Sequence, residues 1–296
     1  MTSIPPVPRE WRPTLGGDRL GAAALLMPSL LGVAVFFVAP ASALVWLSTQ
    51  RWNIVSPPEG AGVENFATVL TDPSFGHAVA VTAAIAAIAL PLEIGCALLL
   101  AIVAVRRAPG VRVWRAVIVL PWLVAPFVSG TLWRWILAPS SGWIATLTGE
   151  RFDGLIDPTT APLLVALVVA WSETGYVALF FIAGLLAIPP AQTDAARVDG
   201  AGTLSTLWFI QLPQLRAILV FVVVTGTIRM LGVYDQVIAL TGGGPGSATQ
   251  TVALWIYDTA FGAFDIGTAA SGSLVILGVA LVGLALLRSR RPGHER

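Results

Sequence analysis

The sequence predicts an all-α integral membrane protein with six transmembrane helices and a cytoplasmic helix–turn–helix loop between helices 4 and 5. Of its 296 residues, 56% are hydrophobic and only 11% are charged. A soluble domain has about 45–50% apolar and about 25% charged residues. The mean hydropathy of +0.82 agrees with this difference. Six apolar runs are long enough to cross a hydrocarbon core about 30 Å thick as helices. No pattern of barrel strands competes with them.

The six runs lie at about 20–48, 77–105, 116–138, 162–186, 217–240 and 266–287. Several contain proline, which transmembrane helices tolerate because neighbouring helices satisfy the freed backbone groups. We therefore expect one membrane domain over residues 20–287, a tail at 1–19 and a second tail at 288–296.

The first run could be mistaken for a signal peptide. It follows three arginines, and Ala41-Ser42-Ala43 has the form of a cleavage site. Its apolar stretch is nevertheless about twice the length of a signal-peptide core. We interpret it as an uncleaved transmembrane helix.

The distribution of arginine predicts the orientation in the membrane, because cytoplasmic loops carry an excess of basic residues. All basic residues of the chain are arginines, and most of the 17 fall on one side. These are Arg9, Arg12, Arg19, Arg106, Arg107, Arg112, Arg115, Arg197, Arg216, Arg288, Arg290, Arg291 and Arg296. Only Arg51, Arg134 and Arg151 fall on the other. Both termini are therefore expected in the cytoplasm, in a multi-pass protein of the cell membrane.

Composition also argues against several function classes. The net charge is +1 and the arginines are scattered, so nucleic acid is a poor partner. Cys96 is the only cysteine, and it lies in an apolar run. Neither Cys96 nor His77 has partners at metal-ligand spacing, so we expect no disulfide framework, no metal site and no catalytic residues.

The segment between the fourth and fifth runs differs from the other loops. Pro189 and Pro190 suit the start of a helix, where a missing N–H costs nothing. Gly200 and Gly202 allow the chain to turn out of that helix, and a second short helix can run to Pro213. The result is either a docking element for another protein or an ordinary interfacial connector.

Three groups of residues in this segment resemble the EAA loop of ABC-importer permeases. They are Asp194-Ala195-Ala196, Asp199-Gly200-Ala201 and Ile210-Gln211-Leu212-Pro213. Their spacing is that of the carbohydrate-uptake branch, E-A-A-x-x-D-G-A, eight residues, then I-x-L-P. Tyr234-Asp235 followed by Leu240-Thr241-Gly242-Gly243-Gly244-Pro245 is similar to a second signature of the same MalF- and UgpA-like branch.

A finer resemblance is to the UspA-type permeases of amino-sugar importers. It rests on L-P-W at 120–122, W-R-W-I-L-A-P at 133–139 and G-Y-V-A-L-F-F at 175–181. The loop also departs from the family pattern, since Asp194 stands where glutamate is usual, Gly202 where serine is common and Leu207 where an aromatic is common. Asp194 keeps the negative charge, so we expect docking to survive.

The resemblance implies a permease subunit of an ATP-driven importer for a sugar or sugar derivative. Its implied partners are a second permease subunit in a heterodimer, cytoplasmic ATPase subunits, an extracellular substrate-binding lipoprotein and membrane lipid. The loop at 189–213 would seat in a groove of one ATPase. ATP and Mg would be used by that ATPase, because this chain has no lysine and hence no G-x-x-x-x-G-K-[ST] loop. We expect no cofactor on this chain.

Charged residues at bilayer depth cost at least about 2.5–3.5 kcal/mol each on insertion scales and therefore need a reason. Glu93, Glu173 and Arg229 each lie near the middle of a predicted span. We expect Arg229 to pair with one of the two acids, while the other acid faces the pathway or is protonated. A packing pair without substrate contact is the alternative.

Four further residues are candidates for substrate contact. Trp171 and Tyr176 flank Glu173 in the sequence, and aromatic rings beside a carboxylate suit sugar binding. Tyr234 and Asp235 lie near the outer end of the fifth run, where Asp235 could bond sugar hydroxyls or cap a helix.

Two other functions are compatible with some of these residues. An ion-coupled secondary transporter would use Glu93, Glu173 and Arg229 as a proton relay, but the spans show no clear inverted repeat. A membrane-embedded transferase would need acids or histidines gathered at one face, and the outer acids are dispersed. The substrate stays open among amino sugars, disaccharides and glycerol phosphates, although no basic cluster favours a phosphate.

Overall fold

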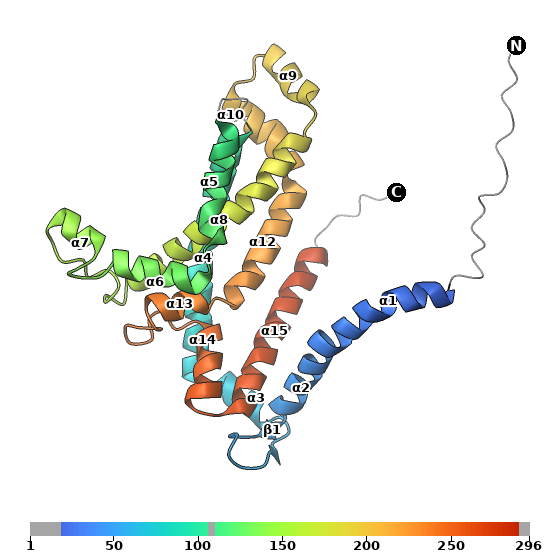
Figure 1. Cartoon of the computed structure of the whole chain (residues 1–296), viewed down its shortest axis with the longest axis vertical. Helices are drawn as coiled ribbons and strands as arrows, with labels where there is room; N and C mark the ends of the chain where they lie inside the picture. Colours follow the sequence, from blue (N-terminus) through green and yellow to red (C-terminus); the bar gives the residue numbers. More distant parts are fainter. Residues whose placement is uncertain (1–18, 106–109, 290–296) are drawn as a thin grey trace, which may run out of the picture.

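The computed structural model describes residues 19–105 and 110–289 (Figure 1). Helices make up most of this part of the chain. The helix–turn–helix loop lies at one end of the molecule, and a small hairpin lies at the other. Residues 1–18 and 290–296, which make up most of the predicted tails at 1–19 and 288–296, fall outside the described residues, as do Arg106 and Arg107.

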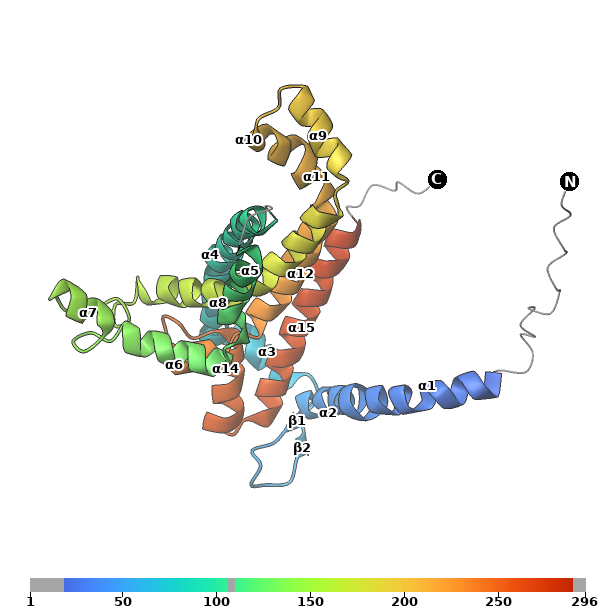
Figure 2. The same cartoon turned by 45° about the horizontal axis from the view of Figure 1, so that its top comes forward.

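The first predicted span forms an arm of three consecutive segments, α1 (Arg19–Val33), η1 (Ala34–Val38) and α2 (Ala39–Ser48). The wide π-turn η1 comes just before Pro40, which cannot donate a backbone hydrogen bond. The arm projects away from the other helices in both views (Figures 1 and 2). None of its most apolar stretch is buried by the other described residues.

The arm ends at a hairpin that is fixed to the rest of the molecule. Strand β1 (Gln50–Arg51) pairs antiparallel with β2 (Glu59–Gly60), and α3 (Glu64–Thr71) follows. Buried Asn65 of α3 donates from Nδ2 to the carbonyl oxygens of Ser48 and Gln50, at 2.9 and 2.8 Å. These bonds join the end of α2 to the outer loop.

Two long helices, α4 (Pro73–Ala104) and α8 (Ala161–Ala187), pack together to form the centre of the molecule. Helix α12 (Arg216–Leu231) packs against both, and α15 (Ile266–Ser289) packs against α2 and α3. One buried cluster lies toward the hairpin end and includes Ile85, Val169 and Met230. A second lies toward the loop and includes Ala97, Val177, Phe181 and Leu215.

The prediction of one continuous helix over 116–138 is wrong. The structure has α5 (Val111–Leu123) and α6 (Pro126–Ile136), bent by 93° at the break. Val124 and Ala125 have non-helical backbone, with ψ of 128° and 137°. For Ala125 the reason is Pro126, since proline disfavours helical geometry in the residue before it. Helix α7 (Trp143–Thr148) follows at the end of this side arm.

The prediction of one helix over 217–240 is also wrong. Helix α12 ends at Leu231, and a separate short helix α13 (Asp235–Leu240) begins after three residues. Arg229 consequently lies in the last turn of α12 rather than near the middle of a span. The outer part of the chain then continues through α14 (Val252–Tyr257) and the π-turn η3 (Asp258–Gly262).

The helix–turn–helix loop follows α8 and leads into α12. It consists of α9 (Pro190–Val198), α10 (Thr203–Thr206), η2 (Leu207–Gln211) and α11 (Leu212–Gln214). Four helices within the described ranges are long and apolar enough to cross a bilayer. The number rises to as many as six if two bent pairs, α5 with α6 and the segment Thr203–Gln214 with α12, each count as one span. The predicted fold class, all-α with up to six spans and this loop, is confirmed.

Candidate functional site

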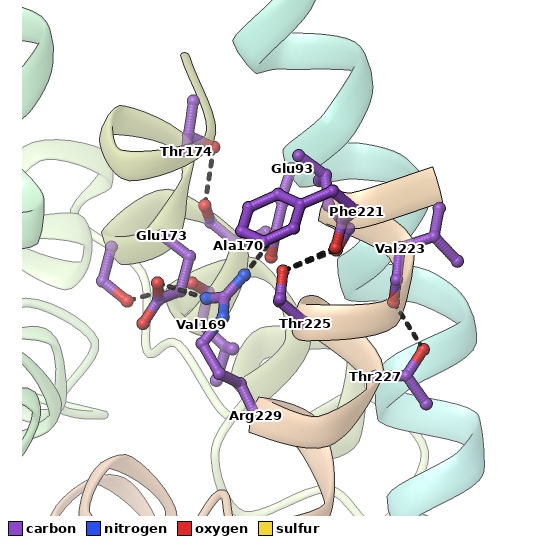
Figure 3. Close-up of polar contacts among 12 residues, drawn as sticks. Glu93, Val169, Ala170, Glu173, Thr174, Phe221, Val223, Thr225, Thr227 and Arg229 are labelled. Atoms are coloured by element: carbon purple, nitrogen blue, oxygen red, sulfur yellow. Dashed lines mark hydrogen bonds and ion pairs between the residues drawn. The ribbon is translucent and has the colours of Figure 1, made fainter. Parts of the chain in front are cut away.

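An ion cluster links three of the central helices (Figure 3). Arg229 on α12 donates from Nη2 to Oε1 of Glu93 on α4, at 2.7 Å. Its Nη1 forms an ion pair with Oε2 of Glu173 on α8. The sequence predicts that Arg229 pairs with one acid and leaves the other apart. The structure instead brings all three residues together.

The two acids are in unequal surroundings. The side chain of Glu93 is 0% exposed, whereas Glu173 is 19% exposed and Arg229 is 28% exposed. Among the residues that the structure describes, Oε2 of Glu93 has no hydrogen-bond partner. Glu173 and Arg229 therefore form the accessible side of the cluster, and Glu93 forms its buried side.

Aromatic rings extend the cluster toward the break between α5 and α6. The ring of Tyr176 lies 5.5 Å from the guanidinium carbon of Arg229, within cation–π range. Trp122 stacks on Tyr176, with centroids 5.1 Å apart and planes at 27°. Trp122 stands in the last turn of α5. Sequence reasoning did not select it, because nothing in the sequence pairs Trp122 with Tyr176.

Trp171 is not on the same face of α8 as Glu173. Residues two apart in a helix point to different sides, whereas residues three apart are neighbours. Tyr176 accordingly joins the cluster, and Trp171 makes an edge-on contact with Trp133 of α6, with centroids 5.4 Å apart. The helical period alone is enough to predict that Tyr176, and not Trp171, shares a face of α8 with Glu173.

Tyr234 and Asp235 lie beyond the break that follows α12. Asp235 is the first residue of α13, and the ring of Tyr234 lies 4.8 Å from that of Tyr257. Within the described part of the chain, no hydrogen bond or ion pair joins either residue to the Arg229 cluster. They form a separate group nearer the outer loops.

The turn of the helix–turn–helix loop depends on Gly200. The N–H of Ala201 donates to the carbonyl of Ala196 at 2.8 Å, and the N–H of Gly200 donates to the carbonyl of Arg197 at 3.1 Å. This bond pair is a Schellman motif, which needs a left-handed residue after the helix. Gly200 supplies it with φ of +81°. Gly202 instead has φ of −69° and ψ of 168°, which any residue can adopt.

The loop presents a mixed surface to its surroundings. Ala196 faces inward, while Asp194, Ala195 and Asp199 are exposed, and Asp194 pairs with Arg197 at 3.2 Å. On the second half of the loop, three apolar side chains are exposed. They are Leu204, Trp208 and Phe209, and they line a shallow hollow together with Ser205. Exposed apolar patches of this kind mark interaction sites.

Ile210, Leu212 and Pro213 of the predicted motif lie where the loop returns to the membrane helices. Ile210 and Leu212 are half-buried, and Pro213 is exposed. Ile210 and Leu212 therefore contribute less to the outer surface of the loop. The motif residues that a partner could reach are Asp194, Ala195, Asp199, Gly200 and Pro213.

The helical fold with several spans, the exposed helical loop and the ion cluster between the spans fit a membrane transport permease. Residues 93–291 match the sequence profile described as "Binding-protein-dependent transport system inner membrane component". The chain belongs to this family of ABC-transporter permeases, as its motifs indicate. The family includes neither the secondary transporters nor the transferases that the sequence leaves open.

Named relatives match nearly the full length of the chain. The UgpA permease of the sn-glycerol-3-phosphate transport system of Agrobacterium fabrum is 34% identical over 90% of this chain and 92% of its own length. The MalF permease of the trehalose/maltose system of Thermococcus litoralis is 31% identical, over 90% and 93%. These relatives are named transport subunits, which confirms the prediction of a non-enzymatic chain.

A solved structure has the same fold. A chain of the bacterial alginate ABC transporter, in complex with a periplasmic protein carrying an alginate pentasaccharide, superposes with a TM-score of 0.79. The superposition covers 93% of this chain and 95% of the transporter chain, and the two sequences are 21% identical. At this identity the match supports the fold alone.

Proposed function

We propose that this chain is a permease subunit that forms part of the translocation pathway for a sugar or sugar derivative. Relatives belong to transport systems named for substrates of this kind, among them trehalose and maltose. Substrate would arrive on an extracellular binding protein and cross as cytoplasmic ATPase subunits bind and hydrolyse ATP. The single observation that carries the proposal is the family match over residues 93–291.

Coupling to the ATPase would run through the loop at 189–213. The loop is exposed, lies at the end opposite the hairpin, and is shaped by the Gly200 turn. Asp194, Ala195, Ala196, Asp199, Gly200 and Ala201 would form the docking segment, with Ile210, Leu212 and Pro213 bracing it. The ATP and Mg would belong to the ATPase, and this chain would bind no cofactor.

A second permease subunit would complete the pathway. The α1–α2 arm makes no buried contact within its most apolar stretch, whereas half of the corresponding stretch of α8 is buried. A transmembrane segment that is so isolated in its own chain is suited to packing on another. We expect a heterodimer, with both termini of this chain in the cytoplasm of the cell.

Within this class an amino sugar is the substrate that we propose, because three segments of the sequence resemble UspA-type permeases. The relative UgpA belongs to a system named for sn-glycerol-3-phosphate, so a phosphorylated substrate is the alternative that the test below distinguishes. Besides the ion cluster of Glu93, Glu173 and Arg229, the candidate contacts along the pathway are Trp171, Tyr176, Tyr234 and Asp235. Among these four, only Tyr176 adjoins the cluster within the described part of the chain.

The test is a pull-down of tagged protein from detergent-solubilised membranes, with every stoichiometric partner identified by mass spectrometry. Wild type is compared with Gly200→Val, since a β-branched residue does not tolerate a φ of +81°. Gly202→Ser is the matched control, because its backbone is unstrained and serine can cap α10.

We expect a second permease and an ATPase with wild type and with the control, and loss of the ATPase with Gly200→Val. The accompanying binding protein would identify the sugar. If Gly200→Val retained the ATPase fully, coupling through this loop would be rejected.

A further inference from the structure

The helix–turn–helix loop at 189–213, here called the coupling loop, and the ion cluster connect α8 to α12 at two different levels. Two extended residues, Ile188 and Pro189, join α8 to α9, and a 69° bend at Leu215 joins α11 to α12, so the loop connects the two helices at one end. Glu173 on α8 and Arg229 on α12 pair with each other further along. At 1.5 Å per residue, Glu173 lies about 21 Å from the loop end of α8, and Arg229 lies about 20 Å from the loop end of α12. The two helices are therefore joined at matching depths.

Between these two ends, α8 and α12 touch in two further places. Gly184 of α8 lies so close to Leu215 and Ile218 that an added Cβ would come within 2.6 Å of Leu215 Cδ2. The rings of Phe180 and Phe221 lie 5.0 Å apart. The contacts are thus distributed from the loop to the cluster.

Helix α4 is connected to α8 and α12 through Arg229. Glu93 accepts its hydrogen bond at 2.7 Å, and Gly226 packs closely on Leu90 of α4. A Cβ at Gly226 would come within 2.6 Å of Leu90 Cδ2 but would lie at an ordinary 3.6 Å from both Arg229 Nη2 and Glu93 Oε1, so the glycine allows the close approach of α12 to α4 beside the ion pair. One guanidinium thereby holds three helices.

The apolar contacts alone would not fix the helices in register. Lipid tails are as apolar as leucine, so apolar packing between helices in a membrane has no hydrophobic driving force, and polar contacts provide the directional ties. An arginine fork between two carboxylates is a contact with fixed geometry. The cluster is consequently the feature that can make these helices move together.

We propose that Arg229, Glu93 and Glu173 are positioning residues that make α4, α8 and α12 move with the coupling loop as one rigid unit. Movement imposed on the loop by the ATPase would then appear at the depth of the cluster, about 20 Å away. This inference rests on the proposed docking of the loop. It assigns the cluster a mechanical role that does not require contact with substrate.

The experiment measures a distance within the unit while the ATPase acts on it. Spin labels are placed at Thr203 in the loop and Thr227 on α12, both exposed, after Cys96→Ala. The purified complex with its ATPase is measured without nucleotide and after trapping with ATP and vanadate. In wild type we expect no change in the Thr203–Thr227 separation on trapping.

The cluster is then removed as a whole by Glu93→Met, Glu173→Met and Arg229→Met together. Replacing a buried ion network with apolar residues of similar volume is often neutral for stability, so this variant should assemble. We expect the Thr203–Thr227 separation to shift on trapping. The matched control removes the exposed Arg51–Glu64 pair (2.5 Å) by Arg51→Met and Glu64→Met, and it should behave as wild type.

A change in the wild-type separation on trapping would overturn the inference, and so would an unchanged separation in the triple variant. If the triple variant fails to assemble, Arg229→Lys takes its place, because lysine keeps the charge but cannot bridge two carboxylates as a fork. It should then show the shift, and an unchanged separation would again overturn the inference. Failure of the ATPase to co-purify with wild type would instead reject the proposed docking.

Discussion

Removing Arg229 alone should destabilise the protein, and a second substitution should restore it. In Arg229→Met, the carboxyl group of Glu93 stays in a position with 0% exposure and loses its counter-ion and its only hydrogen-bond partner among the described residues. Glu173 also loses its ion pair but is 19% exposed, so it can be partly hydrated. Neutralising Glu93 should therefore restore more of the lost stability than neutralising Glu173.

The expected magnitude follows from this burial. Removing one partner of a buried ion pair costs about 3–5 kcal/mol, because it leaves an uncompensated charge. In a chain of this size that corresponds to a fall in melting temperature on the order of 10 °C. Adding Glu93→Gln to Arg229→Met should recover more than about 1 kcal/mol, within the usual range for directly bonded residues. Adding Glu173→Gln should recover less.

The assay is thermal unfolding of the purified complex in detergent, followed by tryptophan fluorescence, for wild type, the three single variants and the two double variants. The order of recovery is the informative result. If Glu173→Gln rescued Arg229→Met better than Glu93→Gln did, or if neither rescued it, the unequal burial would not control the energetics of the cluster.

Three further outcomes are expected. Gly200→Ala should strain the loop by about 1–2 kcal/mol and weaken ATPase binding by up to about thirtyfold. Gly202→Ala should leave ATPase binding unchanged. Titration of the ATPase onto the immobilised permease distinguishes the two variants. Arg51→Ala should alter the free energy of unfolding by less than about 1 kcal/mol, since the Arg51–Glu64 pair is solvent-exposed; a larger loss would contradict this. Asn65→Leu should cost about 1–3 kcal/mol, because it removes one donor from the carbonyl of Gln50 and one from that of Ser48, which keeps the hydroxyl of Ser271. An unchanged melting temperature would show that the hairpin is held by other contacts.

The long helices could be predicted because hydropathy depends only on composition. α4, α8 and α15 are each at least 20 residues long and strongly apolar, so a window over the sequence is enough to find them. The turn at Gly200 was equally accessible, since a glycine after a helical motif is a local signal. Proline and glycine spacing thus predicted the architecture of the loop.

The bends could not be predicted in the same way. Pro126 is visible in the sequence, but proline occurs in both straight and broken spans, and what holds the bend is tertiary packing. Gly130 of α6 lies directly against α13, where a Cβ added to it would come within 2.8 Å of Ala239 Cβ, so α6 can turn away from α5 and still be held. The double pairing of Arg229 depends on the same three-dimensional arrangement, because Glu93 and Glu173 come from helices far apart in the sequence.

The α1–α2 arm also bears on how the chain is made in the cell. The first membrane segment touches α15 near the hairpin, but none of its most apolar stretch is buried by the other described residues, so the membrane-insertion machinery releases a helix that is covered only when a partner binds. Copies synthesised beyond the supply of a partner would be substrates for membrane quality-control proteases. We therefore expect the abundance of this chain to follow that of its partner, and expression without the partner to shorten its lifetime.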